Sequence, residues 1–411
     1  MAGESPLNIM RSAARPVRKR TPAPRPHRRL RAVFWLTAMV IVVAVGWSWL
    51  WYYAASIADR ALAGWIDREA ALGRVYACGA QSIGGFPFSI VTRCGNAAAA
   101  FNSNRPPFDV RATDIAFSAQ VFRPTLLHGE ITGPVTLADP GQPPIFVANW
   151  SRAQITLLGL PPEPERVGIA LRQPRLDRVA GAGTGLIFQA DRVEVDGRIV
   201  GGSARNNPVI EATGHFAAAT APSFHPLLAE PLSGDIDVTL RGFKDFSPKP
   251  WPALFRDMQA SGGGIEIKSL RIERADAIIV GTGILTVNEH GKLDGVIHLA
   301  VAGVETIVPL LGIDQLIGQG IDRLTGGSGS SAQVPGAQGL GAQGLGALDR
   351  LVPGLSGVVR EGANASLIEN IKKMGQPTEI DKKPAVALPL RVTDGIIFLG
   401  LIPLGVVPPL F

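Results

Sequence analysis

The sequence predicts a mainly β protein of the α+β class. One N-terminal transmembrane helix precedes a large antiparallel sheet domain, either curved or built in two layers, with a few packing helices. Three observations predict this class. An uncharged apolar run lies near the N-terminus, apolar residues alternate with polar ones from about residue 73 onward, and the chain contains 48 Gly and 33 Pro among 411 residues. Abundant turn residues between short alternating segments are typical of strands rather than of a helical bundle.

The transmembrane helix is predicted from residues 32–58, which contain no charged side chain. As a helix, this run is long enough to cross a hydrocarbon core of about 30 Å. Nine Arg and Lys residues within 1–31 precede it, against the single acid Glu4. The positive-inside rule therefore places residues 1–31 in the cytoplasm and the main domain in the periplasm, as a single-pass protein of the inner membrane.

A cleaved signal peptide is the alternative interpretation of this run, because Ala61-Leu62-Ala63 resembles a cleavage site. The run exceeds the roughly 7–15 apolar residues of a signal peptide, which favours an uncleaved anchor. After it, apolar residues at helical spacing predict a stalk helix over 56–72. The expected organisation is a cytoplasmic tail 1–31, a transmembrane helix 32–55, a stalk helix 56–72, a β-rich domain 73–325, a flexible low-complexity loop 326–350, and a C-terminal helix with closing strands 351–411.

The alternation with a period of two is clearest in Ile236-Asp-Val238-Thr-Leu240 and in the run from Leu293 to Val301. Such strands have one apolar face, which must pack on a second sheet, on helices or on an apolar ligand. Helices are expected near 304–324 and 363–374, and a buried closing strand near 395–405. Few helices are thus available to cover the sheet.

Cys78 and Cys94 are the only cysteines, and they bracket a predicted hairpin whose tip is Gly85-Phe86-Pro87-Phe88. Disulfides form in exported proteins, so we expect these two residues to be paired, with two free buried thiols as the alternative. No nearby His completes a metal-ligand set.

The composition and motifs give little support to other functions. Outside the tail, 31 basic residues face 33 acidic ones, so no basic bias toward nucleic acid exists. No nucleophile elbow or phosphate loop occurs, and the six His are scattered. We therefore expect no catalytic residues, no cofactor, no bound metal and no enzymatic activity; a hydrolase without a recognisable motif is the third hypothesis.

The turn motif Gly85-Phe86-Pro87-Phe88, following an anchor and a stalk helix, resembles a family of uncharacterised bacterial proteins. That family combines the anchor, this turn and an apolar final strand near Asp394-Gly395. A second resemblance covers 264–311, where Gly and apolar residues alternate as in AsmA-like envelope proteins. The second resemblance implies an inner-membrane anchor, periplasmic β-sheet and a role in envelope maintenance or lipid traffic.

The leading functional hypothesis is a non-enzymatic, membrane-anchored periplasmic protein of cell-envelope biogenesis that binds lipid or another apolar ligand on its sheet. The predicted apolar groove contains Ile265, Ile267, Ile297 and Leu299. The expected partners are the inner membrane, lipid or envelope proteins, and no nucleic acid. A structural scaffold with a closed core and no ligand is the alternative.

Overall fold

The computed structural model describes residues 26–160, 163–181, 183–224, 228–246, 249–307, 368–369, 372–400 and 402–411. The chain divides into two compact units, and the boundary lies between Ser56 and Ile57. The fold confirms the mainly β class, because the described residues of the second unit form one antiparallel sheet of 19 strands with few helices.

Helix α1 runs without interruption from Pro26 to Ala71. The sequence predicted a transmembrane helix over 32–55 and a stalk helix over 56–72, and both ranges lie in this one helix except for Leu72. No Pro or Gly occurs between Gly46 and Gly64, so nothing in this stretch breaks the helix. From Leu30 onward, α1 is long and apolar enough to cross a membrane.

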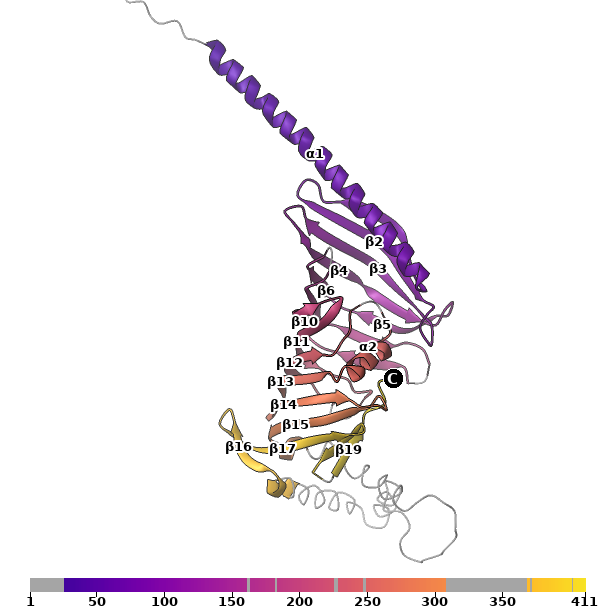
Figure 1. Ribbon diagram of the computed structural model, residues 1–411, viewed down its shortest axis with the longest axis vertical. Coiled ribbons are helices and arrows are strands. Elements are labelled where there is room, and N and C mark those ends of the chain that lie inside the picture. Colours follow the sequence, from indigo (N-terminus) through magenta and orange to yellow (C-terminus); the bar gives the residue numbers. More distant parts are fainter. Residues whose placement is uncertain are drawn as a thin grey trace, which may run out of the picture. The chain divides into compact units, whose positions relative to one another are not determined.

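The sheet contains antiparallel neighbours only, and it is open rather than closed into a barrel. Figure 1 shows strands β10 to β15 following one another in chain order. The strands are β1 (Arg74–Gly84), β2 (Ser89–Phe101), β3 (Phe108–Gln120), β4 (Arg123–Ala138), β5 (Pro144–Asn149), β6 (Arg152–Leu158), β7 (Arg166–Arg172), β8 (Arg175–Arg178), β9 (Gly185–Gln189), β10 (Arg192–Ser203), β11 (Asn206–Ala219), β12 (Leu232–Arg241), β13 (Gly264–Arg274), β14 (Ala277–Val287), β15 (Leu293–Ala302), β16 (Gln376–Ile380), β17 (Lys383–Thr393), β18 (Ile396–Leu399) and β19 (Ile402–Val406).

From β4 onward the sheet continues as two halves, because β5 and β6, β7 and β8, and β9 and β10 are each separated by a two-residue interruption. Strand β4 pairs with β6 along its first half and with β5 along its second half. The first half continues from β6 to β7 and then to β10. The second half continues from β5 to β8 and then to β9. The strands break at Trp150, at Gln173-Pro174 and at Ala190-Asp191. Pro174 has no amide hydrogen to donate to a ladder, which explains one of the breaks.

Two short helices pack near the C-terminal strands. Helix α2 (Trp251–Ala260) begins after Pro250 and buries Met258 completely. Met258 belongs to a cluster with Phe243 and Val287. Helix α3 (Val304–Ile307) contributes Val304 to a second cluster, with Leu388 and Leu399. The sequence did not predict α2.

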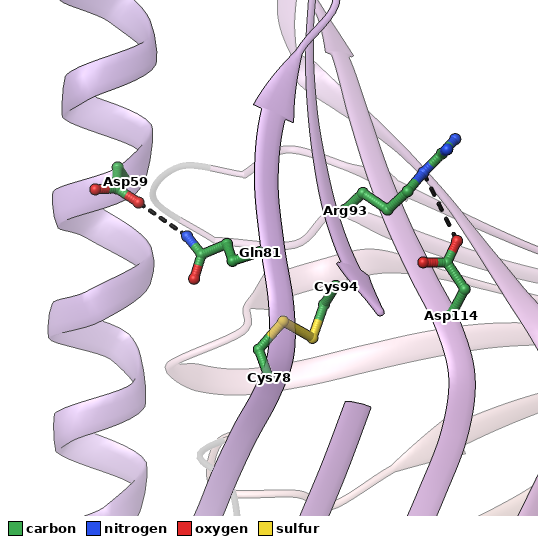
Figure 2. The surroundings of a disulfide bond; sticks show 6 residues. All are labelled: Asp59, Cys78, Gln81, Arg93, Cys94 and Asp114. Carbon is green, nitrogen blue, oxygen red and sulfur yellow. Dashed lines mark hydrogen bonds and ion pairs between the residues drawn. A yellow bond between two sulfur atoms is a disulfide. The ribbon is translucent and has the colours of Figure 1, made fainter. Parts of the chain in front are cut away.

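Cys78 and Cys94 form a disulfide between β1 and β2, with their Cα atoms 5.5 Å apart (Figure 2). On the same hairpin, the Gln81 side chain donates a 2.9 Å hydrogen bond to Asp59 of α1. The Trp65 ring of α1 packs on Tyr76 of β1, with centroids 4.8 Å apart. The segment of α1 after Ile57 therefore lies against the first hairpin.

Several sequence predictions concern residues outside the described ranges. The predicted low-complexity loop 326–350 lies entirely there, as do residues 1–25 of the predicted cytoplasmic tail. Of the helix predicted over 304–324, only α3 is described. Residues 368–369 and 372–374 of the helix predicted over 363–374 are described, and they are helical. The closing strands are β17, β18 and β19.

Candidate functional site

The two faces of the sheet differ sharply in polarity. Residues directly opposite each other on neighbouring antiparallel strands point to the same face, so a row of partners can be followed across the sheet. One row contains only Gly and apolar residues from β3 to β17. Its members are Phe117, Gly129, Ile155, Ile169, Val195, Gly214, Ile236, Leu270, Gly281, Leu299 and Leu388.

A second row, two residues further along each strand, has the same character. Its members are Ala119, Leu127, Leu157, Val167, Gly197, Ala212, Val238, Ile267, Gly283, Ile297 and Leu390. We call the surface made by both rows the apolar face. Strand β13 keeps its register on this face through a bulge between Ile267 and Leu270. In a regular strand, two residues three positions apart would point to opposite faces, and the bulge brings both to the same one.

The four residues of the predicted groove lie on this face, but protein covers part of them. Ile297 and Leu299 belong to the two rows, and Gly283 and Gly281 stand directly opposite them. Ile267 is buried, with 8% of its surface exposed. Ile265 packs against the cluster formed by Met258 of α2. Helix α2 therefore occupies the position that the sequence assigned to a ligand near Ile265.

Helices lie at both ends of the apolar face. The α1 segment contacts Gln81, which stands opposite Cys94 on this face of β1 and β2. At the other end, α2 and α3 pack over β12 to β17 through Met258 and Val304. Among the described residues, the large apolar side chains that stay open lie between these ends. We call them the open apolar stretch: Phe117, Val167, Ile169 and Val195, exposed by 38%, 37%, 40% and 46%.

Gly129 shapes one edge of the open apolar stretch. A Cβ atom at this position would lie 2.8 Å from Cε1 of Phe117 and 3.3 Å from Cβ of Ile155. Only a residue without a side chain lets the Phe117 ring lie over β4 and approach Ile155. The glycine therefore makes the apolar surface continuous from β3 to β6.

The opposite face carries a polar groove. Its volume is about 1080 Å³, and it extends over strands from β2 to β13; most lining side chains belong to this face, and Ile155, Ile169 and Val195 of the apolar rows also contribute to the lining. Its charged groups face one another across neighbouring strands: His215 Nδ1 lies 2.7 Å from Asp235 Oδ1, and Arg166 Nε lies 2.8 Å from Asp196 Oδ2. The described residues include no group of three or more His, Cys, Asp or Glu side chains arranged to hold a metal ion.

Hydrogen bonds between charged side chains shift the pKa values of two groups on the polar face. Lys268 and Arg198 both donate to the Glu211 carboxylate, and these hydrogen bonds lower the pKa of Glu211. The same contact with Glu211 raises the pKa of Lys268. Each group is thereby held in its charged form, as in a cross-strand ion pair on a hydrated surface.

The turn motif Gly85-Phe86-Pro87-Phe88 closes the β1–β2 hairpin. Gly85 has φ +97°, and a Cβ there would lie 2.7 Å from the Ser89 carbonyl oxygen, so only glycine fits. The Ser89 amide donates a 3.0 Å hydrogen bond to the Gly85 carbonyl oxygen. Phe86 and Phe88 remain 53% and 61% exposed.

The fold and α1 define the class: a mainly β protein with an N-terminal helix that is long and apolar enough to span a membrane. The chain belongs to a family described as an uncharacterised protein conserved in bacteria, DUF2125, whose model matches residues 51–408. No match was found among curated proteins or among solved structures.

Proposed function

We propose that this protein is anchored in the bacterial inner membrane by α1 and holds the acyl chains of a lipid on the open apolar stretch of its periplasmic sheet. It acts in envelope biogenesis without a catalytic step. The observation that carries the proposal is the exposure of 37–46% of four large apolar side chains on one continuous face. Apolar surface of this kind beside a membrane is typical of a binding site.

The dimensions of the open apolar stretch suit an acyl chain. From β3 through β4, β6 and β7 to β10 there are four strand spacings, or about 19 Å. One leaflet of a bilayer has a hydrocarbon thickness of about 15 Å, half of the full core. An acyl chain laid across the strands would gain about 0.8 kcal/mol for each methylene group that it buries.

The resemblance to AsmA-like envelope proteins is part of this proposal. In such proteins the sheet extends into the periplasm from an inner-membrane anchor, and the apolar face described above supplies a surface along which lipid can lie. The proposed topology is tested with a reporter that is active only in the periplasm. The reporter should be active when fused after Phe411 and inactive when fused before residue 25, and the reverse pattern would contradict the topology.

Photo-crosslinking in cells tests the ligand directly. A photoreactive amino acid replaces Val195, and the matched control replaces Glu194, the neighbouring residue that points to the polar face. Ile169 and Ala170 form a second such pair, because they stand opposite Val195 and Glu194 on β7. Lipid adducts are expected at Val195 and Ile169 and not at Glu194 or Ala170. Equal adducts on both faces, or none at Val195 and Ile169, would contradict lipid binding.

The scaffold hypothesis makes a different prediction in the same experiment. Two clusters of buried residues, one around Met258 and one around Val304, show that the chain's own elements fill part of the apolar face near the C-terminus. If another protein covers the rest, the adducts at Val195 and Ile169 would contain protein instead of lipid. That outcome would favour an interaction scaffold.

A further inference from the structure

Two neighbouring hairpins of the sheet end in exposed aromatic side chains. Phe86 and Phe88 lie in the β1–β2 turn, and Phe122 lies in the β3–β4 turn. They are exposed by 53%, 61% and 70%. The two turns are joined, because the Val121 amide donates a 3.0 Å hydrogen bond to the Phe88 carbonyl oxygen. The rings of Phe88 and Phe122 stack with centroids 6.3 Å apart. We call this group the aromatic tip.

The contacts of β1 with α1 show which end of the sheet carries the aromatic tip. Arg74, the first residue of β1, pairs with Glu69, and Tyr76 packs on Trp65. Seven residues after Arg74, Gln81 bonds to Asp59. Strand β1 therefore runs back along α1 toward Ile57. Figure 2 shows the Gln81 side chain pointing from β1 toward Asp59 of α1.

The aromatic tip lies further in that direction. From Gln81 to Gly84, the last residue of β1, the strand advances about 10 Å. The uncharged run of α1 ends at Ala58, next to Asp59. The tip therefore lies at the end of the second unit where the chain enters it, directly after the apolar run that could span a membrane.

The chemistry of the aromatic tip fits a membrane surface. Residues 82–92 and 119–129 contain no Asp or Glu, so no carboxylate loses its hydration when the tip meets lipid. Arg123, beside Phe122, is exposed and can meet lipid phosphates. At the other end of the same strands, the turn around Asn104 is polar and is followed by Asp109. Aromatic residues favour the interface between headgroups and hydrocarbon.

We propose that the aromatic tip inserts into the interfacial layer of the membrane that holds α1, as a second, peripheral contact of the domain with lipid. This contact would hold the sheet in one orientation to the bilayer. It is independent of whether lipid occupies the open apolar stretch, because Phe86, Phe88 and Phe122 lie in turns outside that stretch.

Fluorescence quenching in vesicles tests this contact. Phe88→Cys and Phe122→Cys are each labelled with an environment-sensitive maleimide dye in the full chain. The dye does not react with Cys78 and Cys94 in their disulfide. The matched control is Asn104→Cys, in the turn at the other end of β2 and β3. The labelled proteins are reconstituted into vesicles of phosphatidylcholine and phosphatidylglycerol that carry a spin label high on the acyl chain.

At least twofold stronger quenching is expected at both tip positions than at Asn104. Equal quenching at all three positions would overturn the proposal. The two tip residues lie on different hairpins. If one variant does not fold, the other variant still tests the membrane contact. Resistance to limited proteolysis identifies folded samples. Failure of crosslinking at Val195 together with strong quenching at the tip would reject lipid on the sheet and keep the membrane contact.

Discussion

The C-terminal part of the sheet and its middle part are built from the same kind of strand, yet only the first has its own core. All three clusters of buried apolar residues found in the described ranges lie between Phe243 and Leu399. In the middle, Ile169 and Val195 belong to the same apolar row as Leu388, but they are 40% and 46% exposed, against 7% for Leu388. The rows are continuous, and only the covering elements differ.

This difference shows that the apolar pattern of a strand does not determine what covers it. Helices α2 and α3 supply the cover over the C-terminal strands, whereas no described helix does so over β3 to β10. The sheet is held together there by backbone pairing and by cross-strand ion pairs such as Arg166–Asp196. Covering the exposed apolar side chains with a ligand or a partner would remove apolar surface from water, which is favourable.

Truncating one residue in each region gives the largest expected contrast. Met258→Ala removes a completely buried side chain from the α2 cluster, and it should lower the free energy of unfolding by about 2–5 kcal/mol. Val195→Ala removes a half-exposed side chain, and it should cost less than about 1 kcal/mol. Urea unfolding of the full chain in one detergent measures both. Similar losses at the two positions would show that the middle of the face is packed as tightly as the α2 region.

The first hairpin relies on a covalent link. Replacing both Cys78 and Cys94 with Ser opens a loop whose ends are 16 residues apart, and it should cost about 3 kcal/mol on the chain-entropy model. Ala97→Ser on the same hairpin controls for the added hydroxyl group. Thiol labelling of the denatured, unreduced protein should find neither cysteine free. Full labelling without reductant, or an unchanged unfolding midpoint, would show that the link contributes nothing.

A small side chain added to each face distinguishes a packed surface from a hydrated one. Gly129→Ala puts a methyl group 2.8 Å from the Phe117 ring, and displacement of that ring should cost about 1–3 kcal/mol. Gly168→Ala on the polar face meets the end of the flexible Asp196 side chain at 3.2 Å, and it should cost less. Thermal unfolding of both variants makes the comparison. An equal or larger cost at Gly168 would mean that the polar face is the more rigid one.

Much of this architecture could be predicted from the sequence, because local patterns encode it. The alternation around Ile236 and Leu293 predicted strands, and the uncharged run predicted α1. Helix α2 was missed although Trp251, Leu254, Phe255 and Met258 recur at helical spacing, because the helix is only ten residues long and Pro250 and Pro252 at its start are typical of a turn.

The open apolar stretch depends on register, which the sequence alone does not reveal. Phe117, Ile169 and Val195 are far apart in the chain, and only strand pairing through Gly129 and Ile155 joins them. The bulge near Lys268 is a second obstacle, since it brings Ile267 and Leu270 to one face against the period of two. The predicted groove was placed partly where α2 packs, because the sequence did not predict that helix.

The smallest expected effect concerns the turn that ties the closing strands to the C-terminal core. The Asp394 carboxylate accepts hydrogen bonds from Lys292 Nζ at 2.7 Å and from Asn288 Nδ2 at 3.3 Å. The Lys292 hydrogen bond is the main reason that the pKa of Asp394 lies below its ordinary value. A carboxyl group with a lowered pKa in the folded state contributes stability above its unfolded pKa of about 3.9, and this contribution is lost as pH falls through the folded pKa.

Asp394→Asn tests this contribution, because Asn tolerates the φ of +50° found at this position. The variant should be slightly less stable than the original protein from pH 7 to about pH 5, and the difference should shrink below about pH 4 as the carboxylate becomes protonated. Urea midpoints measured across this range provide the test, with Asp139→Asn in the β4–β5 turn as the background. A difference that persists unchanged at pH 3 would mean that the shape of the turn, and not the ionised carboxylate beside Lys292, secures the closing strands.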